Sequence, residues 1–158
     1  VLQSMSLLKF SLPYVADSTQ LFERIAHKPW AIMLDSGQPH SQYGRYDILV
    51  AEPFMTITSG EDTDGIFSEI TEHGQPRRLR DDAFAVLNQV LSPYHAANSA
   101  LPFTGGAVGY FSYDLARQIE QLPNIAQPTI AVPHMKIGIY DWAVVVDHRE
   151  KTACLISN

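Results

Sequence analysis

A polar cluster between two apolar runs contains the residue types in this chain that best suit ligand chemistry. The segment LDSGQPHSQYGRYD, residues 34–47, brings a hydroxyl, an arginine and two aromatic rings together in the sequence. This mixture suits a small ligand with an apolar ring and a charged end. The candidate binding residues are Ser36, Tyr43, Gly44, Arg45 and Tyr46. The alternative is a polar connecting loop in which Arg45 forms a salt bridge with Asp47 or Asp35.

A second candidate is the glycine cluster in LPFTGGAVGYFSYD, residues 101–114. Glycines ahead of a helix can hold a phosphate, but a dinucleotide site needs Gly-x-Gly-x-x-Gly and a P-loop needs a Lys-Ser/Thr pair. Here the spacing is Gly-Gly-x-x-Gly, and Tyr-Phe-Ser follows at 110–112. We therefore expect glycines that bend a strand or admit another backbone closely. The nearby aromatic residues are expected in the core: Phe103, Tyr110, Phe111 and Tyr113.

The sequence shows no residue pattern typical of an active site. None of the six histidines pairs at metal-ligand spacing, and Cys154 is the single cysteine. There is no Gly-x-Ser-x-Gly elbow. The carboxylates fall mostly at turns and helix starts, where capping explains them. We predict no catalytic and no metal-binding residues, and we expect histidines at turns to be solvated.

Composition and charge exclude other classes of function. The net charge of −6 argues against nucleic-acid binding, which needs a surplus of Lys and Arg. The one basic cluster, within residues 77–80, is followed by two aspartates and indicates a solvated loop. A lone cysteine, expected to be buried, fits a reducing cytoplasm. No apolar run is long enough to span a bilayer and no signal peptide is visible, so we expect a cytoplasmic chain without a membrane partner.

Strands and helices follow one another without β-α-β alternation. Helices are expected over 17–29, 81–94 and 114–121, the second capped by Asp81 or Asp82. Strands and hairpins are expected over 30–37, 46–60, 66–81, the glycine-rich run and 135–157, and the second of these segments is interrupted at Pro53. Loops are expected at 59–65 and 122–133. This predicts an α+β fold, an antiparallel sheet or sandwich with flanking helices, in one domain over 1–158. Residues 1–4, which precede Met5, are set aside as a cloning remnant.

At family level, LPFTGGAVGYFSYDLARQIEQLP resembles the Pro-Phe-x-Gly-Gly-x-x-Gly-Tyr-x-x-Tyr-Asp signature of component I of the chorismate-utilising synthases. This family includes anthranilate synthase and aminodeoxychorismate synthase. The aminodeoxychorismate, or para-aminobenzoate, branch is favoured by further segments in the right order: HKPWAIMLDSG, YDILVAEP and GIYDWAVVVDH. The resemblance covers nearly the whole chain after the first dozen residues.

The resemblance implies an enzyme that makes 4-amino-4-deoxychorismate from chorismate and ammonia for folate synthesis. It covers only the amino-terminal third or so of the family's component I. The magnesium-binding glutamates, the acid/base groups and the attacking lysine belong to the family's carboxy-terminal domain, and their motifs are not found here. These 158 residues are thus expected to be a non-catalytic lobe, inactive alone and without a cofactor of their own. Its expected partners are that catalytic domain and a glutaminase component II.

The resemblance also implies that the polar cluster is part of a tryptophan pocket. The family's pocket serine falls on Ser36, and its Tyr-Ser-Arg-Phe-like segment falls on residues 43–46. Gly44 departs from the serine expected there, so a backbone contact survives and a hydroxyl contact is lost. In anthranilate synthases the pocket serves feedback inhibition, whereas in some aminodeoxychorismate synthases tryptophan is a structural ligand. The rest of the pocket comes from the carboxy-terminal part.

Two alternatives stay open at this point. The first alternative is the amino-terminal regulatory lobe of an anthranilate synthase component I. The second is a stand-alone module that binds a small molecule.

Overall fold

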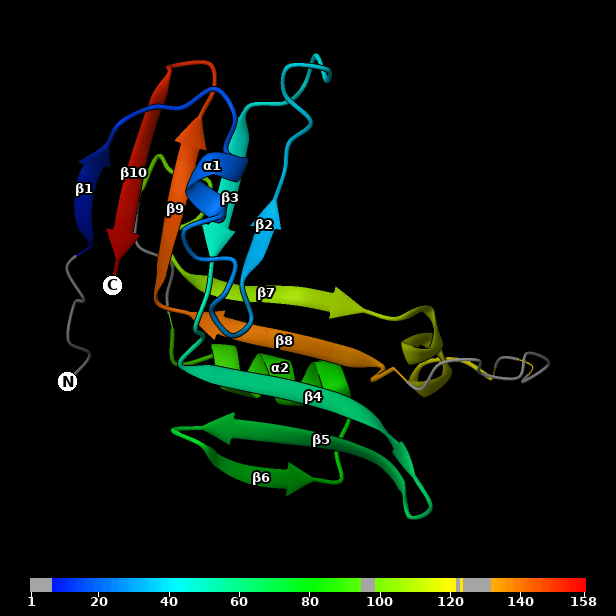
Figure 1. Ribbon diagram of the computed structural model, residues 1–158. Coiled ribbons are helices and arrows are strands. Elements are labelled where there is room, and N and C mark those ends of the chain that lie inside the picture. The colour runs from blue at the N-terminus through cyan, green and yellow to red at the C-terminus, as the bar shows by residue number, and fades with distance from the viewer. Residues whose placement is uncertain (1–6, 95–98, 122, 124–131) are drawn as a thin grey trace. The chain divides into compact units, whose positions relative to one another are not determined.

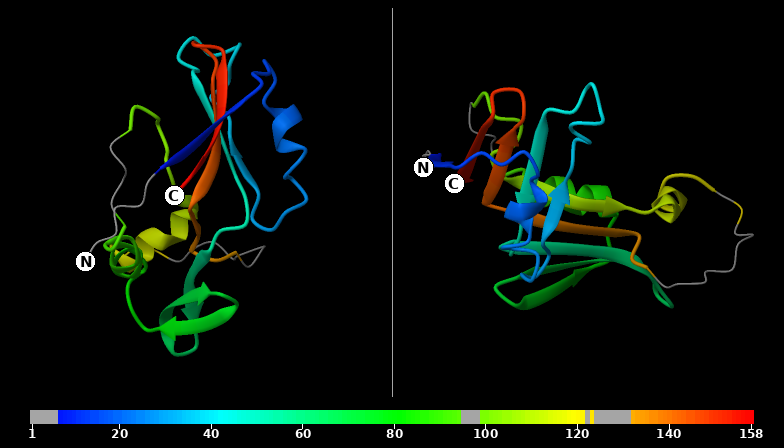
Figure 2. Two further views of the ribbon diagram at one scale, coloured as in Figure 1. Left: turned by 90° about the vertical axis from the view of Figure 1, so that its left-hand side faces the viewer. Right: turned by 45° about the horizontal axis from the view of Figure 1, so that its top comes forward.

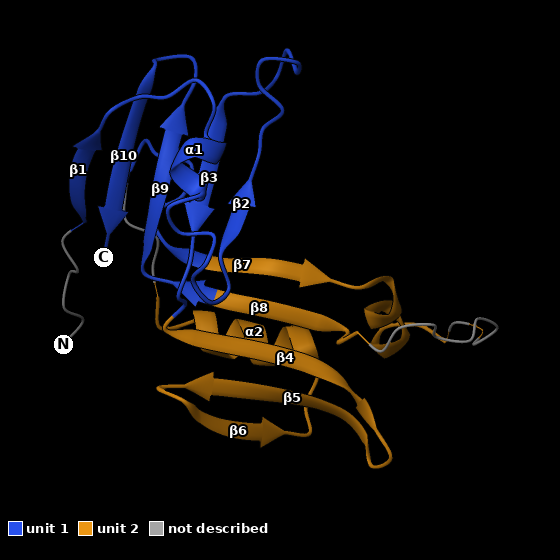
Figure 3. Ribbon diagram, viewed as in Figure 1, with its two compact units in different colours: residues 1–53, 95–106, 139–158 blue, residues 54–94, 107–138 orange. Residues whose placement is uncertain are grey.

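The chain forms two compact units whose segments alternate along the sequence. A computed structural model describes residues 7–94, 99–121, 123 and 132–158. Unit 1 comprises residues 1–53, 95–106 and 139–158, and unit 2 comprises 54–94 and 107–138 (Figure 3). Residues 1–4 and most of the connection expected over 122–133 lie outside the described residues. The prediction of one domain over 1–158 stays a prediction.

Unit 1 is built on a five-stranded sheet in which every pair of neighbours is antiparallel. Its strands, in spatial order, are β1 (Leu8–Leu12), β10 (Thr152–Ser157), β9 (Trp142–Asp147), β3 (Tyr46–Val50) and β2 (Ile32–Leu34). The short helix α1 (Thr19–Phe22) lies against one face of this sheet (Figures 1 and 2). Fully buried apolar side chains of the central strands form the core, among them Leu49, Val146 and Ile156.

A second five-stranded sheet belongs mostly to unit 2. Its strands, in spatial order, are β6 (Gln75–Leu79), β5 (Gly65–Glu72), β4 (Met55–Asp62), β8 (Met135–Tyr140) and β7 (Gly106–Phe111). Helix α2 (Ala83–Leu91) packs against β5, and a 3₁₀ helix (Tyr113–Gln118) follows β7. Ile57, Met135 and Val86 lie in the core of this unit.

Helix α2 begins where its sequence predicts. Asp82 is the N-cap, and its Oδ1 accepts hydrogen bonds from the backbone N–H groups of Phe84 (3.0 Å) and Ala85 (2.9 Å). These bonds satisfy two of the donors that a helix start leaves free. The buried face is formed by Ala83 and Val86, whereas Phe84 is 41% exposed and stacks on Phe111.

The glycine cluster serves close backbone packing. A Cβ at Gly109 would overlap the Lys136 carbonyl oxygen, and it would lie 2.8 Å from Ile137 Cα. Only a residue without a side chain therefore fits at this point, where β7 lies directly beside β8. The interpretation of close backbone approach is confirmed at Gly109.

The predicted α+β class with antiparallel sheets and flanking helices is confirmed. Several details differ. The first helix is one turn long, the 59–65 loop is largely strand in β4 and β5, and the third helix is a 3₁₀ helix. Three of the four aromatics expected in the core are exposed: Tyr110 by 41%, Phe111 by 49% and Tyr113 by 85%. Among the described residues, no helix is long and apolar enough to cross a membrane.

Candidate functional site

Ser36 is fixed by the carboxylate of Asp47. The sequence leaves β2 at Leu34, and the loop that follows returns to β3, in which Asp47 is the second residue. Both the backbone N–H and the hydroxyl of Ser36 donate to Asp47 Oδ1, each at 2.9 Å. These two bonds attach the loop to β3 at Ser36, the first residue of the candidate site.

Asp47 is also hydrogen-bonded to a buried histidine. His148 Nε2 lies 2.8 Å from Asp47 Oδ2, and the two side chains are only 2% and 5% exposed. On the other side of the imidazole, the Tyr14 hydroxyl bonds His148 Nδ1 at 3.2 Å. Ser18, buried at the start of α1, lies 3.5 Å from His148 Nε2 and hydrogen-bonds Asp47. Four segments of unit 1 thus meet in one polar network.

This network differs from a nucleophile–base–acid triad. In a triad the serine and the carboxylate contact different imidazole nitrogens, so that one nitrogen can take the serine proton while the other stays bonded. Here Ser18 and Asp47 both face Nε2, and Nδ1 faces a tyrosine. Ser18 and His148 are also buried away from solvent. The arrangement can hold positions, but it has no nucleophile poised for attack.

The charge on Asp47 is maintained by its hydrogen bonds. Burial alone would raise the pKa of the Asp47 carboxyl, because the interior disfavours the charged form. The bonds from His148, Ser36 and Ser18 outweigh burial, and the pKa is lowered from its ordinary value. Asp47 is therefore an anion at neutral pH, able only to accept hydrogen bonds.

Arg45 pairs with Asp147 of β9. Its Nε and Nη2 donate to the two carboxylate oxygens of Asp147 at 2.8–3.2 Å, and its guanidinium carbon lies 4.5 Å from the centre of the Tyr46 ring. Asp147 also accepts the N–H groups of Arg149 and Glu150. Hydrogen bonding to Arg45 first, and then to these amides, lowers the pKa of Asp147 to about 2. The expected alternative, a bridge from Arg45 to Asp47 or Asp35, is wrong.

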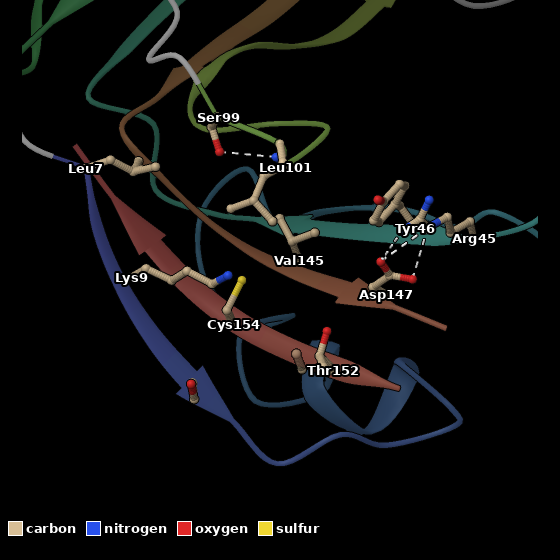
Figure 4. Close-up of a pocket in the computed structure, with 13 residues that line it drawn as sticks. Leu7, Lys9, Arg45, Tyr46, Ser99, Leu101, Val145, Asp147, Thr152 and Cys154 are labelled. Carbon is tan, nitrogen blue, oxygen red and sulfur yellow. Dashed lines mark hydrogen bonds and ion pairs between the residues drawn. The ribbon is translucent and has the colours of Figure 1, made fainter. Parts of the chain in front are cut away.

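A cavity of about 470 Å³ lies within unit 1, on the face of the sheet that carries Tyr46 and Asp147 (Figure 4). Strands β1, β3, β9 and β10 and the segment 99–101 line it. The apolar part of the lining includes Leu101, Val145 and Cys154, and Lys9 extends beside the Cys154 sulfur (Figure 4). Its size falls in the range of pockets for small molecules. The centre is apolar, and Arg45 and Asp147 line one end of the cavity as an ion pair.

The predicted site residues divide between two sides of β3. Arg45 and Tyr46 line the cavity, whereas Ser36 bonds Asp47, whose side chain points to the other face because successive strand residues alternate. Gly44 precedes Arg45 in the chain and lies against Ser36, so it is close to both groups of residues. A Cβ at position 44 would lie 2.7 Å from the Ser36 carbonyl oxygen. Tyr43 is 87% exposed. The assignment of these residues to a tryptophan site stays a prediction.

Sequence reasoning missed Tyr14, Ser18, Asp147 and His148. The expectation that turn histidines are solvated is wrong for His148, which is 7% exposed although it begins the turn after β9. A usable signal was present, because an Asp-His pair directly follows the apolar run of β9. Among the described residues, no three His, Cys, Asp or Glu side chains cluster as metal ligands do.

Comparison with known proteins identifies the family. The chain is 45% identical over 142 residues to aminodeoxychorismate synthase component 1 of Escherichia coli K12, covering 87% of this chain and 30% of the relative. It is 38% identical to the Salmonella typhimurium protein of the same name, covering 99% of this chain and 35% of the relative. No protein-family model matches.

A solved structure supports the same relationship. The crystal structure of anthranilate synthase component I from Streptococcus pneumoniae TIGR4 matches with a TM-score of 0.57 and 28% identity, over 75% of this chain and 25% of that one. The chain spans about a third of the length of the curated relatives that it matches. It belongs to the anthranilate synthase component I family and is homologous to the amino-terminal portion of aminodeoxychorismate synthase component 1.

Proposed function

We propose that this chain is the amino-terminal lobe of an aminodeoxychorismate synthase component 1, and that it contributes a tryptophan pocket rather than catalytic groups. The observation that carries the proposal is the 45% identity over 87% of the chain to a relative of that name. The anthranilate synthase component 1 of Acetivibrio thermocellus is 29% identical over the same share of the chain. The difference favours the aminodeoxychorismate reaction for the whole protein.

In that reaction, chorismate and ammonia give 4-amino-4-deoxychorismate, on the way to para-aminobenzoate and folate. The ammonia would come from glutamine through a second component with glutaminase activity, as the name component 1 implies at family level. Magnesium does not fit the described residues, because no cluster of three ligating side chains is found among them. We therefore assign magnesium and the reacting groups to the catalytic domain of the family. As a separate part of the proposal, we assign the protein to the cytoplasm.

The proposed role of the lobe is to hold an aromatic amino acid. Lys9 supplies positive charge for a carboxylate, Arg45 lines the cavity as an ion pair with Asp147, and Leu101, Val145 and Cys154 supply an apolar surface for a ring. Ser36 and Gly44 meet at the amino end of β3, one residue before Arg45. We place the indole ring in the cavity beside Arg45 and Tyr46, whereas Ser36 and Gly44 hold the loop that leads into β3. Tyr43 and Tyr46 complete the proposed set.

The reaction is tested by giving the intact protein chorismate, ammonia and magnesium, and separating the products by chromatography. The expected product is 4-amino-4-deoxychorismate. Formation of anthranilate would overturn the proposal and make the chain the regulatory lobe of an anthranilate synthase. Tryptophan binding is tested separately by isothermal titration calorimetry. Absence of heat, together with an unchanged melting temperature, would remove the pocket from the proposal.

A further inference from the structure

Strand β7 lies at the end of its sheet, beside β8 (Figure 1). Within the part of the chain that the structure describes, no strand lies on its other side. Residues 107–111 of the strand belong to unit 2. An edge strand presents a row of backbone N–H and C=O groups to which another strand can bond. The sequence of β7 therefore bears on whether this edge stays free in the whole protein.

The other three edges of the two described sheets carry features that discourage the addition of a strand. β6 contains Pro76, Arg77 and Arg78, and β1 contains Lys9. β2 is only three residues long. Proline, charge and shortness all protect a sheet edge from pairing with another chain. β7, in contrast, consists of six residues, GAVGYF, with neither a charge nor a proline. It has the sequence of a strand that is paired on both sides.

The backbone of β7 directs a hydrogen-bond donor to the free side. The N–H of Ser112, directly after the strand, donates at 2.8 Å to the carbonyl of His134, the residue before β8. Ser112 is extended, with φ −76° and ψ 159°. Because successive N–H groups of an extended strand point to opposite edges, the N–H of Phe111 points away from β8. A strand on the free side of β7 could therefore accept this hydrogen bond.

Aromatic side chains flank the exposed half of β7. Tyr110 and Phe111 are both exposed, and they point to opposite faces because successive strand residues alternate. On one face, Phe111 stacks on Phe84 of α2, with the ring centres 5.4 Å apart, and Phe84 is exposed as well. An apolar side chain of a neighbouring strand would cover these two rings, and the burial of their surface would stabilise the pairing.

We infer that β7 is an internal strand of the whole protein, and that a strand of the family's carboxy-terminal catalytic domain pairs with its free edge. The inference rests on the proposed function, in which that domain follows this lobe in one polypeptide. The chain spans 30% and 35% of two aminodeoxychorismate synthase relatives, so about two thirds of such a polypeptide is available to supply the strand.

The chemistry of the edge favours this occupant. A strand in the same polypeptide is present at a high effective concentration, which favours it over a separate partner. The side chain that it places over Phe84 and Phe111 is expected to be apolar, because a charge buried against two phenylalanine rings would have no partner. Recognition otherwise depends on main-chain hydrogen bonds, as in other cases of strand addition to a sheet.

Hydrogen exchange of the intact protein, without component II, tests the pairing. The Phe111 amide is expected to be protected ~100-fold or more over that of Gly74, which lies in an exposed turn. The Ser112 amide, bonded to His134, is the protected reference. The protection should be equal at low and high protein concentration, because the strand belongs to the same polypeptide. Protection that arises only at high concentration would make a second copy the occupant and overturn the inference.

A photo-cross-linking amino acid identifies the occupant. p-Benzoylphenylalanine in place of Phe111 keeps an aromatic ring at the edge, and it is expected to form cross-links within one chain to residues beyond 158. The control carries the same amino acid in place of Arg77, on the protected edge β6, where such cross-links are not expected. Mass spectrometry of the digested protein locates the linked residues. Cross-links from position 111 that are confined to residues 1–158, or that reach a second chain, would contradict the inference.

These measurements do not depend on the reaction assay. If the intact protein makes 4-amino-4-deoxychorismate but its Phe111 amide exchanges as fast as that of Gly74, the inference alone is overturned. If it makes anthranilate, the proposed function fails, whereas protection with cross-links beyond residue 158 still supports the pairing, which needs the carboxy-terminal domain and not a particular product. A whole protein that ends near residue 158 overturns both.

Discussion

Gly44 lies so close to Ser36 that a side chain at position 44 has no room: its Cβ would be 2.7 Å from the Ser36 carbonyl oxygen and 3.0 Å from the backbone nitrogen of Gln38. Both neighbours are backbone atoms, so neither can rotate away. We expect Gly44→Ser, which restores the residue typical of the family, to lower the free energy of unfolding by ~1–3 kcal/mol through overpacking. It should also weaken tryptophan binding, because Ser36 is displaced.

Urea unfolding followed by circular dichroism measures this change. The control is Gly74→Asn, at a turn where no atom lies within 4 Å of an added Cβ and where asparagine tolerates the positive φ of 74°. A Gly44→Ser protein as stable as the wild type would show that the 36–44 loop is not held as described.

Asp147→Asn tests the ion pair of Arg45 and Asp147 in the lining of the cavity. The pKa of Asp147 is lowered from 3.8 to about 2, first by its bond to Arg45. The stabilisation is therefore complete above pH 4 and is lost as the pH falls from 4 toward 2. We expect the substitution to cost about 1–2 kcal/mol at pH 7, a value that allows for solvent screening.

The matching measurement is urea unfolding of the wild type and Asp147→Asn at pH 7 and pH 2. The difference between the two proteins should be large at pH 7 and small at pH 2. Asp64→Asn, at a side chain that is 78% exposed, serves as the control and should change stability little. A difference that is independent of pH would contradict the role of the ionised carboxylate.

Tyr140→Phe removes a single internal hydrogen bond without changing shape. Tyr140 is 1% exposed, and its hydroxyl donates to the Trp30 carbonyl at 2.9 Å. Burial raises the pKa of this hydroxyl to about 12. We expect a loss of ~1 kcal/mol in the free energy of unfolding at pH 7, measured by urea unfolding. Tyr113→Phe, at a ring that is 85% exposed, should have no effect. Equal losses in the two variants would contradict this assignment.

Cys154 reports occupation of the cavity. It is 6% exposed, it lines the cavity, and burial raises the pKa of its thiol, so we expect slow alkylation by iodoacetamide in the folded protein. Saturating tryptophan should slow the reaction further, as followed by mass spectrometry of the modified residue. Indole-3-propionate at saturation is the comparison, since its ring should occupy the same space. Tryptophan that binds without protecting Cys154 would place the ligand elsewhere.

The elements with strong local signals were predictable from the sequence. The capping aspartate of α2 and the terminal hairpin β9–β10 appear where turn and cap chemistry indicates. The first helix was overestimated because none of its residues is fully buried, and a short helix depends on burial for its stability. Strand β1 alternates apolar and polar residues, but it is only five residues long, and it is held at a sheet edge by pairing with residues almost 150 positions away that no local pattern can indicate.

The candidate site was only half predictable. Ser36 and Arg45 stand out by type and spacing, but their partners do not. Asp147 is selected by the register of β3 with β9, which places it opposite Tyr46. Register depends on the whole sheet rather than on any local pattern. Asp35 and Asp47 are closer to Arg45 in the sequence, so sequence reasoning assigned them as its partners. That assignment was wrong, because Arg45 pairs with Asp147.

The bond between Asp47 and His148 joins residues 101 positions apart, and the bond from Tyr14 to His148 spans 134. During synthesis, Ser36 and Arg45 emerge early, yet neither can reach its final setting until residue 148 has left the ribosome. Contacts of such long range also close late in folding. A ligand that needs both residues in place would therefore bind only after synthesis has passed residue 148 and the sheet of unit 1 has formed, so its binding would report the folding of that unit.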